Sequence, residues 1–325
     1  MFAFIEKLTS IVSKHLTVLI LVVMLLGLFS GYLFGGIAFN LGICATASFL
    51  MIYPMFINLS IEDIGEIRNN YYPVGLSIFI NFILSPLFAY GIGWLLLSDE
   101  PFMRLGLILI AFIPTSGMTA TWTERSKGNL KVALSIIAVS LVIVIVGLPL
   151  ALPILAGNLL EAGPWFIFQR IILVILLPLT LGDITRRMII AKKGHEYFKK
   201  KKPLFSGLSS VGLLVVLFLI MSLNTTSVII EHPLLSLKGL ITLFFYYVLM
   251  FGVSTLVTYP MAYPVRVAVI YGTSVRYLAL ALGIVIPLLG QNTNSSLAVL
   301  MVALAFFVQV PFASFYSKWL LHKRL

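Results

Sequence analysis

The sequence is poor in charge and has almost no cysteine. Only 10% of its 325 residues are charged and 60% are hydrophobic, whereas soluble globular proteins have about 25% charged and about 45–50% apolar residues. This shortage of charge excludes a soluble globular protein, because one water-soluble core cannot hide so much apolar surface. The single cysteine, Cys44, excludes an internal disulfide and a cysteine-rich metal site.

The motifs of intramembrane enzymes and of nucleotide-driven pumps are also missing. The sequence contains no Gly-x-Ser-x-Gly, no His-Glu-x-x-His and no phosphate-binding P-loop. Its histidines are His15, His195, His232 and His322, and their spacing does not suit a metal. We therefore expect no enzymatic activity, no cofactor, no metal site and no ATP-driven transport by this chain alone.

Acidic residues are half as common as basic ones, and the net charge is +11 at pH 7. The positive charges fall in short gaps between long apolar runs, so they form no soluble basic face and predict no nucleic-acid partner. The expected partners are a lipid bilayer and a small anionic substrate.

Long apolar runs are what the sequence has in abundance, and a run of about 20 residues can cross a bilayer as a helix. We predict an all-α membrane protein with ten transmembrane spans. The predicted spans are 16–36, 38–59, 72–97, 102–126, 130–156, 164–190, 204–224, 238–258, 263–289 and 295–320. The first run is too long for a signal-peptide core, so we expect it to remain as span 1.

Lysine and arginine residues between the spans fall almost entirely on one side of the membrane. Those on the first side cluster in 1–15, 60–71, 125–131, 186–203, 259–266 and 318–325. The other side holds only Arg104 and Lys238. Because positively charged loops stay in the cytoplasm, we expect a multi-pass protein of the plasma membrane with both termini in the cytoplasm.

The most basic segment, 186–203, separates two halves of five spans each, 1–160 and 161–325, within a single integral membrane unit. An odd number of spans gives the halves opposite orientations, which is the inverted repeat common among transporters. We interpret 186–203 as a cytoplasmic loop that fixes the orientation. A binding site for anionic lipid or for a partner is the alternative.

The fourth span of the first half contains residues that break a helix. Pro114 removes a backbone donor and clashes with the preceding turn, and Thr115, Ser116 and Gly117 follow it. We predict two half-helices with an unwound stretch at 114–117 between them.

The fourth span of the second half, span 9, contains Gly272, Thr273 and Ser274 in its middle, followed by Arg276. Two ordinary kinks are one interpretation, because proline and glycine are frequent in membrane helices. Matching interruptions in two inverted halves favour a binding site, since unpaired backbone at mid-membrane is tolerated only inside protein or along a cavity.

The segment PTSGMTATWTERSKGN, at 114–129, resembles the superfamily that joins bile acid:sodium symporters and arsenite exporters. The residues that agree with the arsenite branch are Pro114, Met118, Trp122, Lys127 and Gly128. Those that agree with the bile acid branch are Pro114, Lys127, Gly128 and Asn129. Weaker agreement comes from LSIED at 59–63, Asn81 to Pro86, VALS at 132–135, LPLTLGDITRR at 177–187 and GTSVRYLALAL at 272–282.

This resemblance implies ten spans, with a core of spans 3–5 and 8–10 and a panel of spans 1, 2, 6 and 7. It implies that the discontinuous spans 4 and 9 cross and that the site lies at their crossing.

The ligands differ from those of both branches. The Ser-Asn pair that serves sodium in the bile acid branch is Thr119 and Ala120 here, and that branch's ninth-span Glu and Gln correspond to about Ile270 and Ser274. The arsenite branch's cysteine corresponds to Thr115. We therefore expect neither two complete sodium sites nor thiol-based capture of arsenite.

Arg276 and Glu124 are ionisable residues within predicted spans, where charges are costly and are commonly paired or functional. Arg276 is either a structural counterion or a fixed positive charge that serves an anionic substrate or replaces a missing sodium ion. Glu124 is either an interfacial residue or the proton-titrating partner of Arg276, and we adopt the second as a hypothesis.

We predict a secondary active transporter that moves an organic anion or a small oxyanion by alternating access, coupled to sodium or protons. The alternatives are metalloid efflux by proton antiport without the usual cysteine, and a transporter-derived membrane sensor. The predicted substrate-binding residues are Asn81, Pro114, Thr115, Ser116, Gly117, Met118, Gly272, Thr273, Ser274 and Arg276. The predicted ion-coupling residues are Thr119, Glu124, Ser135 and Ser274.

Overall fold

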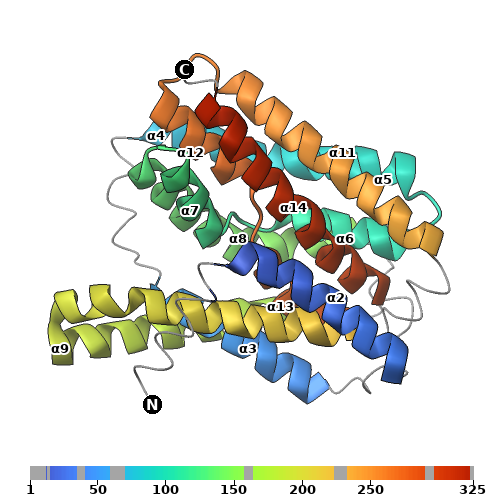
Figure 1. The fold of residues 1–325 in the computed structure, drawn as a ribbon, viewed down its shortest axis with the longest axis horizontal. Coiled ribbons are helices and arrows are strands. Elements are labelled where there is room, and N and C mark those ends of the chain that lie inside the picture. Colours follow the sequence, from blue (N-terminus) through green and yellow to red (C-terminus); the bar gives the residue numbers. More distant parts are fainter. Residues whose placement is uncertain are drawn as a thin grey trace. The chain divides into compact units, whose positions relative to one another are not determined.

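Every regular element that the computed structural model describes is a helix (Figure 1). The structure describes residues 12, 15–34, 41–58, 70–156, 164–222, 233–289 and 296–322. The LSIED motif at 59–63 lies outside these residues.

Five of the described helical stretches are long and apolar enough to cross a membrane, by length and composition. They are Tyr71–Leu96, Leu130–Leu152, Leu176–Ser222, Pro233–Val257 and Leu297–Leu321. Three further apolar helices are shorter: Val18–Phe34, Phe49–Asn58 and Pro101–Phe112. These helices agree with an all-α membrane protein, whereas the count of ten spans, the inverted repeat with halves 1–160 and 161–325, and the cytoplasmic termini stay predictions.

The chain divides into two compact units. Unit 1 comprises Met1–Ser60, Ala162–Pro233 and Leu282–Val299. Unit 2 comprises Ile61–Glu161, Leu234–Ala281 and Leu300–Leu325. Unit 1 thus collects the predicted spans 1, 2, 6 and 7 together with parts of spans 9 and 10.

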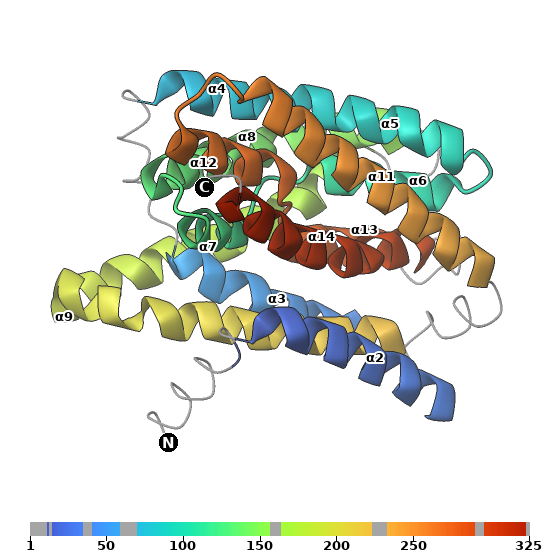
Figure 2. The same cartoon turned by 45° about the horizontal axis from the view of Figure 1, so that its top comes forward.

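Unit 1 contains the helices α2, α3 and α9. Their bounds are Leu16–Phe34 for α2, Leu41–Asn58 for α3 and Pro164–Ser222 for α9. Figures 1 and 2 both show α9 folding back on itself into two arms that lie beside α3. Glycines allow this close packing, because a Cβ on Gly182 or Gly212 would lie 2.9 Å or 2.7 Å from α3 backbone atoms.

The segment 186–203, which the sequence predicts as a cytoplasmic loop, is helical on both sides of Gly194, and its cytoplasmic position stays a prediction. The turn between the two arms of α9 is confined to Gly194, whose φ of 81° is a conformation that glycine adopts without steric cost. The flanking lysine, glutamate and aromatic residues are compatible with a helix and contain no further glycine. On the first arm, Asp183 forms an ion pair with Arg187, with a distance of 2.7 Å between Oδ2 and Nε.

Unit 2 begins with α4 (Tyr71–Phe79), the π-helical turn η2 (Ile80–Leu84) and α5 (Ser85–Leu96), which form one continuous helical rod. Pro86 follows the π turn and cannot donate to the carbonyl four residues before it, which explains the local widening. This turn contains the buried side chain of Asn81.

The remaining helices of unit 2 form two groups along the sequence, and each group contains two consecutive short helices. The first group is α6 (Pro101–Phe112), α7 (Gly117–Arg125) and α8 (Leu130–Ala156). The second group is α11 (Pro233–Val257), α12 (Tyr263–Ser274), α13 (Leu278–Leu289) and α14 (Ser296–His322), of which α13 and α14 lie partly in unit 1.

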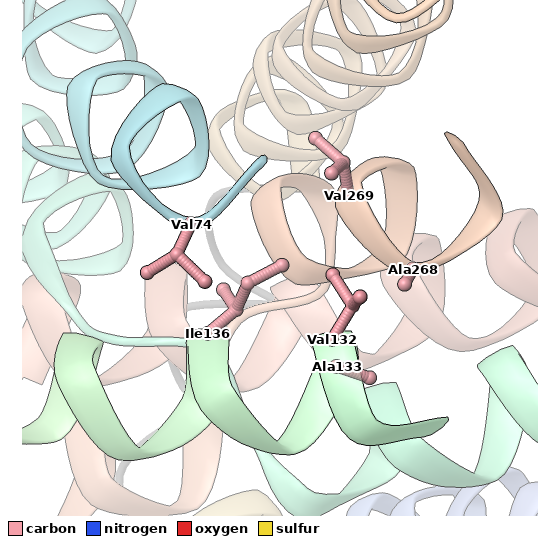
Figure 3. Close-up of a cluster of buried hydrophobic side chains, with 6 residues drawn as sticks. All are labelled: Val74, Val132, Ala133, Ile136, Ala268 and Val269. Carbon is pink, nitrogen blue, oxygen red and sulfur yellow. The ribbon is translucent and has the colours of Figure 1, made fainter. Parts of the chain in front are cut away.

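A buried apolar cluster joins three helices of unit 2 (Figure 3). Its members are Val74 of α4, Val132, Ala133 and Ile136 of α8, and Ala268 and Val269 of α12. Ile136 also packs against Gly272, where an added Cβ would lie 3.0 Å from the Ile136 side chain. This packing fixes the C-terminal end of α12, which leads into the candidate site.

Candidate functional site

The first helix break lies between α6 and α7 and is built by local chemistry. Ile113 leaves the helix with φ −67° and ψ 141°, because the ring of the following proline disfavours a helical conformation in the residue before it. Ser116 then caps α7, and its Oγ accepts a hydrogen bond from the Met118 N–H at 3.2 Å. The break therefore spans 113–116, one residue earlier than predicted.

The second break lies between α12 and α13, and its predicted position is wrong. Gly272, Thr273 and Ser274 are the last residues of α12, and the chain leaves the helix at Val275, with φ −94° and ψ 114°. The break spans 275–277 and contains no proline. Contacts with other segments fix its position.

The two breaks cross and pair through their backbones, and we call residues 113–116 and 275–277 together the crossing. Thr115 and Arg276 form an antiparallel β-bridge. The Tyr277 N–H donates to the Pro114 carbonyl at 2.9 Å. The Thr115 hydroxyl donates to the Val275 carbonyl at 2.9 Å, so side chain and backbone hold the two breaks together.

Gln309 of α14 completes the second break, and sequence reasoning missed it. Its Oε1 accepts from the Arg276 N–H at 2.8 Å, and its Nε2 donates to the Arg276 carbonyl at 3.1 Å. The Tyr247 hydroxyl donates to the same Oε1 at 2.8 Å. The side-chain amide thus pairs both backbone groups of Arg276 as a neighbouring strand would. In the sequence, the one signal for this role is that Gln309 is a lone amide in the apolar run 296–322.

The guanidinium of Arg276 is buried at the crossing, with a relative exposure of 1% for the residue. Its Nη1 donates to Asn81 Oδ1 at 2.9 Å and to the Ile113 carbonyl at 3.4 Å. Asn81 is oriented in turn by Gly272, whose carbonyl accepts from Asn81 Nδ2 at 2.9 Å. Nε and Nη2 of Arg276 are buried and have no hydrogen-bond partner among the described residues.

No acidic side chain in the described part of the chain pairs with this guanidinium. The described acidic residues are Asp99, Glu100, Glu124, Asp183 and Glu196. The structure does not bring Glu124 to Arg276, because Glu124 is exposed near the end of α7. The described residues also contain no group of three His, Cys, Asp or Glu that could hold a metal ion.

The other predicted site residues divide between the crossing and its surroundings. The Thr119 hydroxyl lies within hydrogen-bonding distance of the Tyr271 carbonyl, at 3.2 Å, and of the Thr115 hydroxyl, and its single hydrogen serves one of the two because Thr115 donates to Val275. Thr273 and Ser274 turn toward Ser254 of α11, at 2.6 Å and 3.4 Å between hydroxyl oxygens.

The side chains of three more predicted residues take no part in the crossing's hydrogen bonds. Gly117 begins α7, and the side chain of Met118 is half-buried one residue further along. The Ser135 hydroxyl is buried on α8 without a hydrogen-bond partner among the described residues.

Residues 45–231 match the Sodium Bile acid symporter family. The chain belongs to this family. Membership confirms the superfamily inferred from the fourth-span motif, and it makes this protein an integral membrane transporter rather than an enzyme. The residues matched include the first break and all of α9.

Relatives come from both branches of the superfamily. The chain is 28% identical over 282 residues to the arsenical-resistance protein Acr3 of Alkaliphilus metalliredigens, covering 81% of this chain and 76% of that protein. It is 25% identical over 268 residues to Acr3 of Corynebacterium glutamicum, covering 75% and 71%. It is 28% identical over 152 residues to a probable sodium/metabolite cotransporter, BASS2, of Oryza sativa, covering 47% and 34%.

Proposed function

We propose that this transporter moves an anion, either an organic anion or a small oxyanion, and binds it at the crossing through Arg276. The observation that carries the proposal is a buried guanidinium with two unpaired donors and no acidic partner among the described residues. An isolated charge is costly in an apolar interior. A bound anion would neutralise that charge.

The two free donors suit one class of ligand. Nε and Nη2 lie on one edge of the planar guanidinium, and this edge matches the two oxygens of a carboxylate or an oxyanion. Nη1, on the other edge, is held by Asn81 and the Ile113 carbonyl, so the guanidinium is oriented before a ligand arrives. A preoriented fork binds more tightly because less rotational freedom is lost.

The helices α7 and α13 support the same ligand. Both begin at the crossing, at Gly117 and Leu278. Helix N-termini carry a partial positive charge that favours anions. The C-termini of α6 and α12, which carry a partial negative charge, lie at the same two breaks, so the net positive charge of the crossing comes from Arg276.

Transport in this proposal proceeds by alternating access in the plasma membrane, with both termini cytoplasmic. Thr119, Ser135, Ser274 and Glu124 remain candidate ion-coupling residues from the sequence. The proposal needs no catalytic step, since the substrate crosses the membrane unchanged.

The test is binding and uptake by the purified, reconstituted protein. Acetate, pyruvate, sulfate and phosphate are screened for stabilisation of the protein against heat, because a specific ligand raises apparent stability by mass action. Labelled forms of the stabilising anions are then measured for saturable uptake into proteoliposomes. We expect at least one of these anions to bind and to be transported.

Variants of Arg276 decide whether the crossing is the site. Arg276→Gln is expected to lower affinity by about 30-fold or more, the usual loss when a buried charged pair is broken. Arg276→Lys keeps the charge without the planar fork and should retain weak binding. The matched control is Arg266→Gln, on the helix α12 that leads into the second break but with its guanidinium over the ring of Tyr259, and it should behave as the wild type. Full transport by Arg276→Gln would overturn the proposal.

A second candidate function is arsenite efflux, which the two Acr3 relatives favour. Soft metalloids prefer thiolate ligands, and the corresponding position is Thr115, whose hydroxyl is engaged with Val275. Arsenite efflux from loaded proteoliposomes, measured beside anion uptake, separates the two functions.

A further inference from the structure

The family's name indicates sodium as the coupling ion to be tested at the crossing. Sodium coordinates several oxygen atoms, and in discontinuous helices these are carbonyls that the break has released. The carbonyls of both breaks are therefore the place to ask whether a sodium ion fits.

Two carbonyls of the first break, those of Ile113 and Pro114, already have donors. The Ile113 carbonyl accepts from Arg276 Nη1, and the Pro114 carbonyl accepts from the Tyr277 N–H. Just before the break, the Ala111 carbonyl accepts from the Ser85 hydroxyl at 3.0 Å.

Side chains donate to carbonyls of the second break in the same way. The carbonyls of Gly272, Val275 and Arg276 accept from Asn81, Thr115 and Gln309 respectively. The Thr115 hydroxyl and the amide nitrogens of Asn81 and Gln309 thus act as donors toward the backbone. Each of these carbonyl oxygens has two lone pairs, so the bond occupies one of them and orients the carbonyl.

Arg276 occupies the cation's place in this arrangement. Its Nη1 contacts an amide oxygen, Asn81 Oδ1, and a released carbonyl, Ile113 O. These are two oxygens of the kind that a hard cation selects. A guanidinium stays protonated in proteins, so it supplies a permanent positive charge at this point.

We infer that the Arg276 guanidinium replaces a coupling sodium ion at the crossing, so that anion binding and transport do not depend on sodium. The inference rests on the proposed anion transport. It departs from the sodium coupling in the family's name, because the Arg276 guanidinium already contacts two oxygens that a cation would use. Protons remain available as a coupling ion outside the crossing.

The first experiment needs no substrate and therefore stands apart from the proposed function. The purified protein is melted in sodium chloride and in choline chloride at equal concentration and pH. We expect no stabilisation by sodium relative to choline. Saturable stabilisation by sodium would overturn the inference, even if none of the tested anions bound.

The second experiment uses Arg276→Ser, which releases Asn81 Oδ1 and the Ile113 carbonyl and leaves space for an ion. Sodium is expected to stabilise this variant and not the wild type. Arg266→Ser is the matched control and should show no response to sodium. A response of equal size in the wild type and in Arg276→Ser would place sodium elsewhere, such as at the Ser135 hydroxyl, and would overturn the substitution. No response in Arg276→Ser would also overturn it, because the guanidinium would then fill no cation position.

The third experiment measures counterflow of whichever tested anion stabilises the protein, with choline replacing sodium on both sides of the membrane. A coupling ion changes substrate affinity by about 5- to 150-fold, whereas we expect a change of less than about twofold. Absence of transport in both media would contradict the proposed function, and transport in sodium alone would contradict this inference.

Discussion

The two breaks of unit 2 pair with each other, yet they are built in different ways. The first break contains its own causes, a proline that removes Ile113 from the helix and a serine that caps α7. The second break contains neither a proline nor a side-chain cap of this kind, and Val275 leaves the helix where Thr115, Gln309 and Asn81 hold the neighbouring groups.

This difference explains why the charged residue lies in the second break. A break fixed by local chemistry needs no outside support. A break fixed by tertiary hydrogen bonds brings its partners with it, and here those partners orient the Arg276 backbone from α14 and its guanidinium from η2. The second break therefore provides the binding group, and the first provides the frame against which it is held.

The largest effect is expected from Gln309→Leu, which removes the support of the second break. The Arg276 N–H and the Tyr247 hydroxyl lose their partner, and buried unpaired groups cost about 1–3 kcal/mol each, so the free energy of unfolding should fall by about 2–5 kcal/mol. Thermal unfolding in detergent measures this loss. Gln169→Leu, at an exposed position of α9, is the matched control and should leave the melting temperature within experimental error.

Asn81→Asp tests the charge beside the guanidinium, and it also removes the donor that Asn81 Nδ2 supplies to the Gly272 carbonyl. An aspartate at this position places a carboxylate beside Nη1, so the guanidinium no longer needs an external anion, and anion affinity should fall by about tenfold or more. Isothermal titration with the stabilising anion measures the change. Asn129→Asp keeps the oxygen that caps α8 and should bind anion as the wild type does. Unchanged anion affinity in Asn81→Asp would show that Arg276 does not bind the anion.

Thr115→Val tests the bond between the breaks. The valine keeps the shape but cannot donate to the Val275 carbonyl, and the expected cost is about 1–3 kcal/mol. Hydrogen exchange at the amides of 275–277 should rise more than at 113–116, because the first break has its own supports. Thr180→Val, whose hydroxyl bonds only within its own helix, is the control. An equal rise in hydrogen exchange at both breaks would show that the two breaks do not differ in how they are supported.

The smallest effect is expected from Ser116→Ala, which removes the local cap of the first break. Loss of an N-cap costs about 1 kcal/mol, and Ser116→Gly should cost only a few tenths. Chemical unfolding of both variants measures the difference. A loss as large as that of Gln309→Leu would show that the first break also depends on tertiary support.

The position of the first break could be predicted within one residue because proline acts on its immediate neighbour. The second break was placed about one turn too early, since glycine, threonine and serine lower helix propensity without ending a helix. Gly272 is helical because the apolar cluster of α4, α8 and α12 packs against it (Figure 3). The segment 186–203 was read as a loop from its charge, whereas only Gly194 leaves the helical conformation.

The candidate site was also only partly accessible from the sequence. Arg276 was identified because a charge in an apolar run stands out. Gln309 and Tyr247 were missed because they lie 33 and 62 residues from their partners, Arg276 and Gln309. Glu124 is the partner that the sequence suggests for Arg276, but its exposed position near the end of α7 does not bring it to the second break.

The sequence by itself determined that lipid surrounds this protein, and it determined the apolar helices, the family and the first break. These features follow from composition, periodicity and proline, which act locally. The tertiary structure decided which groups the buried charge meets, which carbonyls are already paired and where the second break begins. These outcomes depend on contacts between distant segments, such as Thr115 with Arg276 and Arg276 with Gln309, which no local pattern specifies.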